Sequence, residues 1–220
     1  MSASFEPAAA PALDDLQVFL SRAARVEEGS VRAIAGSGVL AVYAAIFYPV
    51  GLLDESPTIL GLRTIALRGV DAKFDAVVPV RSLLQRVERA QGESATTVGL
   101  PMEVNTATWA AITPPRGGWQ AAGEVAPALI DQIARAGIRD VAAAIPDGAG
   151  EQIVRKVRSE VWGRPARGAE HLPAGAAFAA FALGFLGEDP VKVYESGPWT
   201  RLSTQRGHVL IKRRAWNLLR

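Results

Sequence analysis

The spacing of apolar side chains near the start of the chain predicts an amphipathic helix. Leu13, Leu16 and Leu20 recur at helical spacing, and two aspartates lie where the first turn would be, a position that favours negative charge. We expect this helix to end near Gly29. The residues before it, 1–12, are rich in alanine and proline and are expected to form a flexible leader.

Runs of β-forming residues then predict an antiparallel sheet over residues 31–80. The two glycines that flank Ser37 form the kind of short loop that closes a hairpin. The run 39–48 carries no charge, which predicts a central strand buried on both faces. After a helix at 81–90, the segment from Asn105 to Ile112 has strand character and is expected to extend this sheet.

The later part of the chain has helical spacing followed again by β-forming residues. Three helices are expected, near 127–145, 147–163 and 174–186, and three short β segments follow to the end of the chain. The order of elements predicts an α+β fold, in which an antiparallel sheet packs with helices and a helical second half is closed by a C-terminal β-hairpin.

These elements suggest a division of the chain into subdomains. We expect a helix plus antiparallel sheet over residues 13–112, a helical subdomain with the C-terminal hairpin over 113–213, and a tail over 214–220. The alternative is that residues 13–213 form one domain.

The third predicted helix, 174–186, has no polar face. Phe178, Phe181 and Phe185 lie on one side of it, and the other side is mostly alanine. A helix without a solvated side is either buried centrally or lies at an interface.

Composition narrows the chemistry that the chain can perform. It has 49% hydrophobic and 21% charged residues and no cysteine, which excludes disulfides, thiolate catalysis and cysteine-based zinc sites. The only histidines, His171 and His208, are too far apart in sequence to form a metal-binding pair, and no GxSxG motif is present. The segment PDGAGEQIV, 146–154, fits a tight turn between helices better than a phosphate site. We therefore expect no catalytic residue, metal or cofactor.

The hydropathy pattern gives no membrane-spanning segment. The uncharged run 172–187 is shorter than the roughly 20 apolar residues that cross a bilayer. The first residues lack the basic region of a signal peptide. These features predict a cytoplasmic protein.

The segment TPPRGGWQAAGE, residues 113–124, is the most distinctive in the chain. Two prolines and two adjacent glycines predict an irregular connection. Arg116 and Trp119, with Glu124 nearby, can form a small ligand-binding site, because arginine offers a planar fork and tryptophan a ring face. The alternative is a rigid loop whose tryptophan packs on the core and whose arginine is solvated.

The end of the chain, from Trp199 onward, is strongly basic. It carries six of the 24 basic residues and no acid, while the remaining residues hold 18 basic and 22 acidic side chains. Apolar and polar positions alternate in it, which predicts a hairpin with one apolar and one basic face. The candidate patch for an acidic protein or a nucleic acid consists of Arg201, Arg206, Lys212 and Arg213. The alternatives are a solvated edge hairpin, in which these charges prevent strand aggregation, and contact with a membrane surface.

Several stretches, taken together, resemble a family of conserved, uncharacterised proteins of high-GC Gram-positive bacteria. The stretches are VRAIAGSGVLAVY, TILGLRT, TPPRGGW, VWGRP and GPWTRLSTQRGHVLIKR, spread from about residue 14 to residue 213. The resemblance implies an actinobacterial setting and no mechanism.

We predict a non-enzymatic binding or assembly protein. It is expected to form a homo-oligomer through the apolar 174–186 helix or through a sheet edge. The first alternative is a nucleic-acid-binding protein that uses the C-terminal hairpin. The second is an enzyme or small-ligand binder with a site near Arg116 and Trp119.

Overall fold

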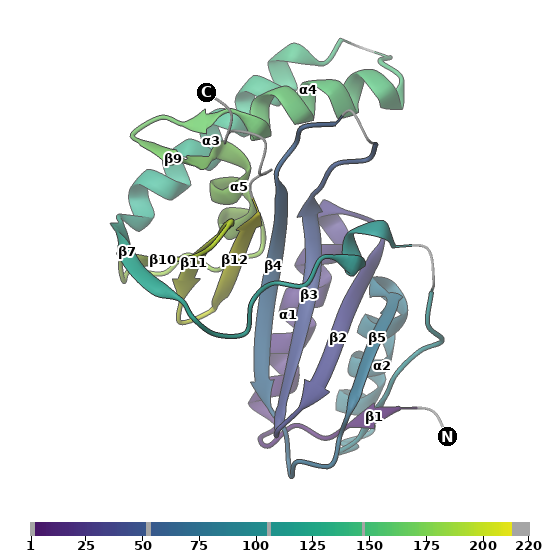
Figure 1. Ribbon diagram of the computed structural model, residues 1–220. Coiled ribbons are helices and arrows are strands. Elements are labelled where there is room, and N and C mark those ends of the chain that lie inside the picture. Colours follow the sequence, from purple (N-terminus) through teal and green to yellow (C-terminus); the bar gives the residue numbers. More distant parts are fainter. Residues whose placement is uncertain (1–2, 52–53, 105–106, 147, 213–220) are drawn as a thin grey trace. The chain divides into compact units, whose positions relative to one another are not determined.

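The computed structural model describes residues 3–51, 54–104, 107–146 and 148–212. The chain forms two compact units (Figure 1). Unit 1 comprises Met1–Ile46 and Gly61–Thr113, and unit 2 comprises Phe47–Leu60 and Pro114–Arg220.

Unit 1 is an antiparallel sheet with two helices packed on it. Its strand order is β5-β2-β3-β4, and α1 and α2 lie side by side on one face of the sheet (Figure 1). Strand β4 is divided between the two units at Leu60. The elements are β1 (Ser4–Phe5), α1 (Pro11–Val26), β2 (Ser30–Gly36), β3 (Val39–Phe47), β4 (Thr58–Ala66), β5 (Phe74–Pro79), α2 (Val80–Gly92), β6 (Val98–Gly99) and the 3₁₀ helix η1 (Thr108–Ala111).

The strands of unit 1 bury one face more fully than the other. In β3, Leu40 and Val42 are buried, whereas Ala41 and Tyr43 between them are half-buried. The predicted burial of this strand on both faces is therefore wrong for its first half. The reason is that α1 and α2 cover only one face of the sheet (Figure 1).

The expected flexible leader differs from what the structure shows. Ser4 and Phe5 form β1, which pairs antiparallel with β6, and Phe5 is only 2% exposed. Pro7 then forms a bridge with Leu67, and the Ala8 amide donates to the Ala66 carbonyl. Burial of one aromatic ring and pairing of the backbone order a segment whose composition alone suggested flexibility.

The predicted strand from Asn105 to Ile112 is wrong in its described part. Residues 105 and 106 lie outside the described residues, and Thr108–Ala111 form a 3₁₀ helix. Its Trp109 ring is buried, and the Ala110 carbonyl accepts a hydrogen bond of 2.7 Å from Arg32 Nη1 on β2. Burial of the Trp109 ring and the hydrogen bond to the Ala110 carbonyl hold this segment in place, so it needs no partner strand.

Unit 2 combines three helices with a run of four antiparallel strands in the order β12-β11-β10-β7 and with the separate antiparallel pair β8–β9. Its elements are β7 (Gln120–Val125), α3 (Pro127–Ala144), α4 (Glu151–Gly163), β8 (Pro165–Ala166), β9 (Ala169–Pro173), α5 (Ala174–Ala182), β10 (Val191–Ser196), β11 (Trp199–Thr204) and β12 (Gly207–Lys212). The α+β prediction, with a helical second half closed by C-terminal antiparallel strands, is confirmed. The expectation that residues 113–124 are wholly irregular is wrong, because β7 begins at Gln120 and pairs with β10.

Helix α5 lies in the interior of unit 2. It contacts α3, α4 and β12, and all of its alanines except Ala182 are buried. Phe178 stacks on Trp162 of α4, with ring centroids 4.4 Å apart. A side chain at Gly137 of α3 would lie 2.2 Å from Trp162 Cζ3, so only glycine admits the indole at this position. Of the two options for this apolar helix, the structure favours central burial.

Candidate functional site

The C-terminal strands of unit 2 have one buried face and one partly exposed face. Leu202, Val209 and Ile211 are at most 1% exposed, and α5 contacts β12. On the other face, Arg201 lies opposite Leu210 of β12, and Ser203 lies opposite His208. The burial follows the predicted alternation except on the otherwise polar face, where Leu210 and Trp199 are buried.

Arg201 on this face is held by two aromatic rings. Its Cζ atom lies 4.6 Å from the centroid of Trp119 and 4.6 Å from the centroid of Tyr194. Tyr194 is brought there by strand register, since it lies directly opposite Arg201 on β10. The Trp119 indole is fixed by its own hydrogen bond, which Nε1 donates to the Pro115 carbonyl over 3.1 Å. Cation–π contacts of this kind orient a guanidinium.

Arg201 has no acidic partner among the described residues. Its Nε atom is enclosed and has no hydrogen-bond acceptor there. Partial burial lowers the pKa of Arg201 below its ordinary value, and the nearby Tyr194 opposes this effect. The lowered pKa reports an environment in which the cation has lost water without gaining an anion.

Two lysines lie on the same face as Arg201. Lys212 Nζ is 5.9 Å from the ring centroid of Trp199, its register partner on β11. Lys192 on β10 lies opposite Ser203 on one side and Glu124 of β7 on the other. The face is therefore basic and aromatic around Arg201, with one acid at its β7 margin.

The structure brings only some of the predicted site residues together. Trp119 contacts Arg201 rather than Arg116, which is exposed, and Glu124 is exposed on β7. Arg206 lies in the β11–β12 turn, where Nη1 donates to the Leu186 carbonyl over 3.0 Å. Arg213 lies outside the described residues.

Tyr194 was not singled out from the sequence. Its position in the strand VKVYES gives no sign of function, because its contact with Arg201 depends on the register between β10 and β11. The alternation of Val191 and Val193 with Lys192 and Tyr194 is the one signal that assigns it to the polar face.

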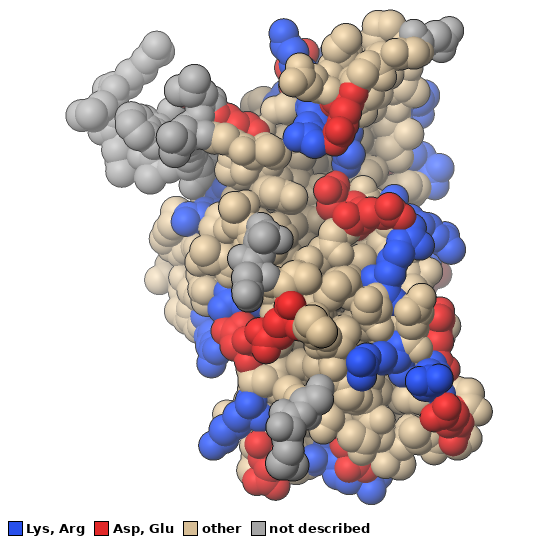
Figure 2. Space-filling model, turned by 90° about the vertical axis from the view of Figure 1, so that its right-hand side faces the viewer, with Lys and Arg blue, Asp and Glu red and all other residues tan. Residues whose placement is uncertain are grey.

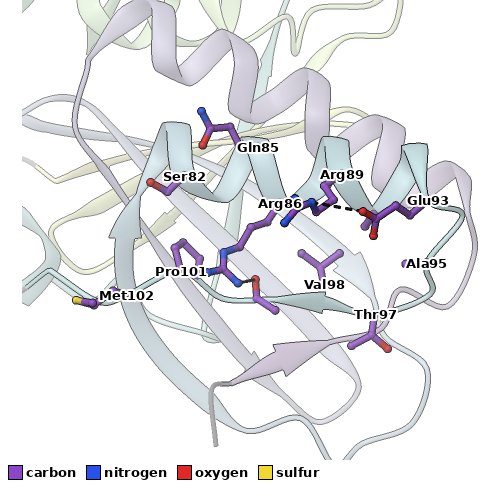
Figure 3. Close-up of a pocket in the computed structure, with 12 residues that line it drawn as sticks. Ser82, Gln85, Arg86, Arg89, Glu93, Ala95, Thr97, Val98, Pro101 and Met102 are labelled. Carbon is purple, nitrogen blue, oxygen red and sulfur yellow. Dashed lines mark hydrogen bonds and ion pairs between the residues drawn. The ribbon is translucent and has the colours of Figure 1, made fainter.

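Unit 1 contains a groove of about 710 Å³ between α2 and the segment around β6 (Figure 3). Arg86 crosses it from α2 toward the Gly99 carbonyl, at 3.5 Å, and Arg89 pairs with Glu93 at 3.4 Å. Met102, 87% exposed, lies at one end. Both groove arginines contact an acceptor of the chain, which distinguishes them from Arg201.

Charges of both signs are mixed on the surface. Figure 2 shows acidic and basic side chains interspersed over the face that it displays. In unit 2, arginines pair with acids of their own chain, as Arg135–Asp131, Arg155–Glu151 and Arg164–Asp140 do. On the face that Figure 2 displays, the interspersed charges form no extended patch of one sign.

The described residues contain no group of three or more histidine, aspartate or glutamate side chains that could hold a metal ion. Glu170, beside His171, accepts a hydrogen bond from the Gly168 amide over 2.9 Å, and this bond lowers the pKa of its carboxyl. Within the described ranges, no helix is both long and apolar enough to cross a membrane.

Two family models match separate segments of the chain. Residues 1–108 match the family model described as domain of unknown function DUF8010, and residues 114–216 match domain of unknown function DUF8185. No curated protein matches the chain. The resemblance to uncharacterised proteins is thus supported at the level of these two domains.

Solved structures with a similar fold are DNA polymerase sliding clamps. The DNA polymerase III subunit beta from Pseudomonas aeruginosa matches with a TM-score of 0.50 and 12% identity, over 97% of this chain and 64% of that chain. A beta sliding clamp from C. crescentus matches with a TM-score of 0.50 and 13% identity, over 97% of this chain and 65% of that one. This chain therefore spans slightly less than two thirds of those proteins, and the likeness concerns the fold alone.

Proposed function

We propose that this protein is a non-enzymatic cytoplasmic binding or assembly protein that forms a homo-oligomer through the edge strand β7. The observation that carries the proposal is the exposure of this strand. Five of its six residues, Gln120–Glu124, are exposed, and only Val125 is buried. The strand is at the end of the sheet order, so among the described residues it pairs with β10 alone.

The chemistry of β7 supports strand pairing between copies. The strand QAAGEV carries one charge, Glu124, and its remaining side chains are small or uncharged. Unpaired amides and carbonyls at such an edge can form the ladder hydrogen bonds of an added strand. A register shift between Val193 and Tyr194 interrupts its pairing with β10.

The edge strand of unit 1 is less available. On β5, the Val77 carbonyl accepts a hydrogen bond of 2.8 Å from the Val104 amide, and Asp75 is held by Arg32. Covering an edge with a loop and charged groups is a common protection against unwanted pairing. The contrast favours β7, and the burial of most of α5 makes that helix the weaker candidate for oligomer formation.

A role in assembly is supported by the name of one similar protein, a subunit of DNA polymerase III. Fold likeness by itself does not transfer function, so the proposal depends on the exposed edge.

Size-exclusion chromatography with light scattering tests the proposal. We expect an oligomer that dissociates at least tenfold more readily in Ala122→Lys, because a lysine on an edge strand opposes pairing. Gln85→Lys on α2 adds the same charge at an exposed site of unit 1 and should leave the oligomer unchanged. A monomer at high protein concentration, or equal behaviour of the two variants, contradicts the proposal.

The second candidate function is nucleic-acid binding by the face that carries Arg201 and Lys212. Basic side chains next to aromatic rings occur in proteins that bind single strands, and phosphate contacts make such binding strongly salt-dependent. The same chromatography with short duplex and single-stranded DNA tests it. Co-migration at low salt that disappears at high salt supports this function, and separate migration at low salt excludes it.

A further inference from the structure

We infer that Arg201 is a recognition site for a carboxylate group, and that the ligand is an acidic peptide segment of a partner protein. The inference rests on the proposed function, because it names the chemical group that a bound partner presents. It depends on three features of unit 2: the fixed position of the guanidinium, its lack of an anion, and the charges around it.

The position of the guanidinium is fixed before any ligand binds. Trp119 and Tyr194 each lie 4.6 Å from Cζ, and Trp119 is held by Pro115. A long arginine side chain ordinarily loses rotamer freedom when it binds, which weakens the complex. Because the two rings already restrict Arg201, less of that freedom remains to be lost.

The guanidinium also lacks the anion that other enclosed arginines of the chain have. Arg32 and Arg63, whose side chains are 15% and 16% exposed, each pair with an aspartate. Arg135 resembles Arg201 more closely, since its Cζ lies 4.9 Å from the Phe181 ring, yet its Nε donates to Asp131 over 2.7 Å. Arg201 alone among these four has no acid partner within the described residues.

A carboxylate fits this site better than a chain of phosphates. The planar fork of arginine matches the two oxygens of a carboxylate, and such charge-assisted bonds are about twice as strong as neutral ones. A nucleic acid needs several cations along its path. Here Glu124 on β7 lies opposite Lys192 on β10, the strand next to that of Arg201. The positive charge of this face is therefore followed by a negative charge one strand away. One strong contact with flanking lysines suits a short acidic peptide.

Nuclear magnetic resonance of the full chain tests the inference. The probes are a short polyglutamate peptide and, separately, a short oligothymidylate, and the signals followed are Arg201 Nε–H and the Trp119 indole N–H. We expect a saturable shift of both signals with polyglutamate. Arg201→Lys, which keeps the charge but loses the fork, should weaken the binding roughly tenfold.

A matched variant controls for charge and fold. Arg135→Lys changes an arginine of the same unit that also contacts a ring but already pairs with Asp131, so it should bind polyglutamate like the original protein. Equal weakening by both variants overturns the inference.

The remaining outcomes separate this inference from the proposed function. Shifts with oligothymidylate but not with polyglutamate overturn it in favour of nucleic acid. No shift with either probe, while light scattering still shows a β7-dependent oligomer, overturns the inference and leaves the proposed function standing. A protein that is a monomer and still binds polyglutamate overturns the proposed homo-oligomer and leaves the inference about Arg201 standing.

Discussion

Arg32 of unit 1 and Arg201 of unit 2 occupy similar positions and have opposite surroundings. Both lie on sheet strands and are half-buried. Arg32 Nε and Nη2 donate to the two carboxylate oxygens of Asp75 over 2.7 and 2.6 Å, and Nη1 donates to Ala110 and Thr113. Arg201 contacts two rings and no acid among the described residues. The first arginine is committed to the fold, and the second retains its capacity to bind an anion.

The directions of the two pKa shifts express this difference. Hydrogen bonding to Asp75 raises the pKa of Arg32 above its usual value, although partial burial works against it. Burial lowers the pKa of Arg201. A cation that the fold stabilises is a structural element, whereas one that the fold leaves partly desolvated and unpaired gains free energy when an external carboxylate binds.

The largest effect is expected from Arg32→Met. The change removes the hydrogen bonds that Arg32 donates to the Asp75 carboxylate and to the Ala110 carbonyl, so the free energy of unfolding should fall by about 2 kcal/mol. Urea unfolding followed by circular dichroism measures this. A loss below roughly 0.5 kcal/mol, the range of ordinary surface changes, would remove the contrast between the two arginines.

A smaller loss is expected from Trp119→Leu. This variant removes one of the two rings at Arg201 and the indole bond to Pro115, which together should cost about 1 kcal/mol in the free energy of unfolding. It should also broaden or shift the Arg201 Nε–H resonance, because the guanidinium gains freedom. An unchanged resonance would mean that Tyr194 alone holds Arg201. The contrast with Arg32 would then depend on the contact with that one ring.

The smallest effect is expected from Arg201→Met. Loss of the cation–π contacts is offset by removal of a partly buried, unpaired charge, so stability should change by no more than about 0.5 kcal/mol. The same unfolding measurement, run beside Arg32→Met, gives the comparison directly. If the two variants lose equal stability, Arg201 is as structural as Arg32.

Local patterns identified much of the fold but fewer of the contacts at the site. Helical periodicity predicted α1 and α3 nearly in full, and the two prolines and two glycines before Trp119 marked that residue as distinctive. Strand β7 was missed because its residues are almost all exposed and show no alternation. It is a strand because β10 pairs with it, and pairing is not visible in QAAGEV itself.

The contact between Trp119 and Arg201 shows why the other contacts at the site could not be predicted from the sequence. Glycine-rich spacing suggested Arg116, the nearest cation in sequence, whereas the cation that contacts the ring is Arg201 from another strand. Tyr194 joins them through the β10–β11 register. Contacts between residues far apart in sequence depend on strand order and register, which composition and periodicity do not contain.

A helix or strand that buries one face can be predicted from the sequence, because its apolar residues recur at the fixed interval of that element. The α+β class, the helices and the alternating C-terminal strands are of this kind. The unpaired state of Arg201 and the exposed edge of β7 are not, since each depends on which groups the folded chain brings near and which it leaves without a partner. The two features on which the proposals rest therefore come from the tertiary arrangement, where the burial of a charge and the pairing of a strand are decided.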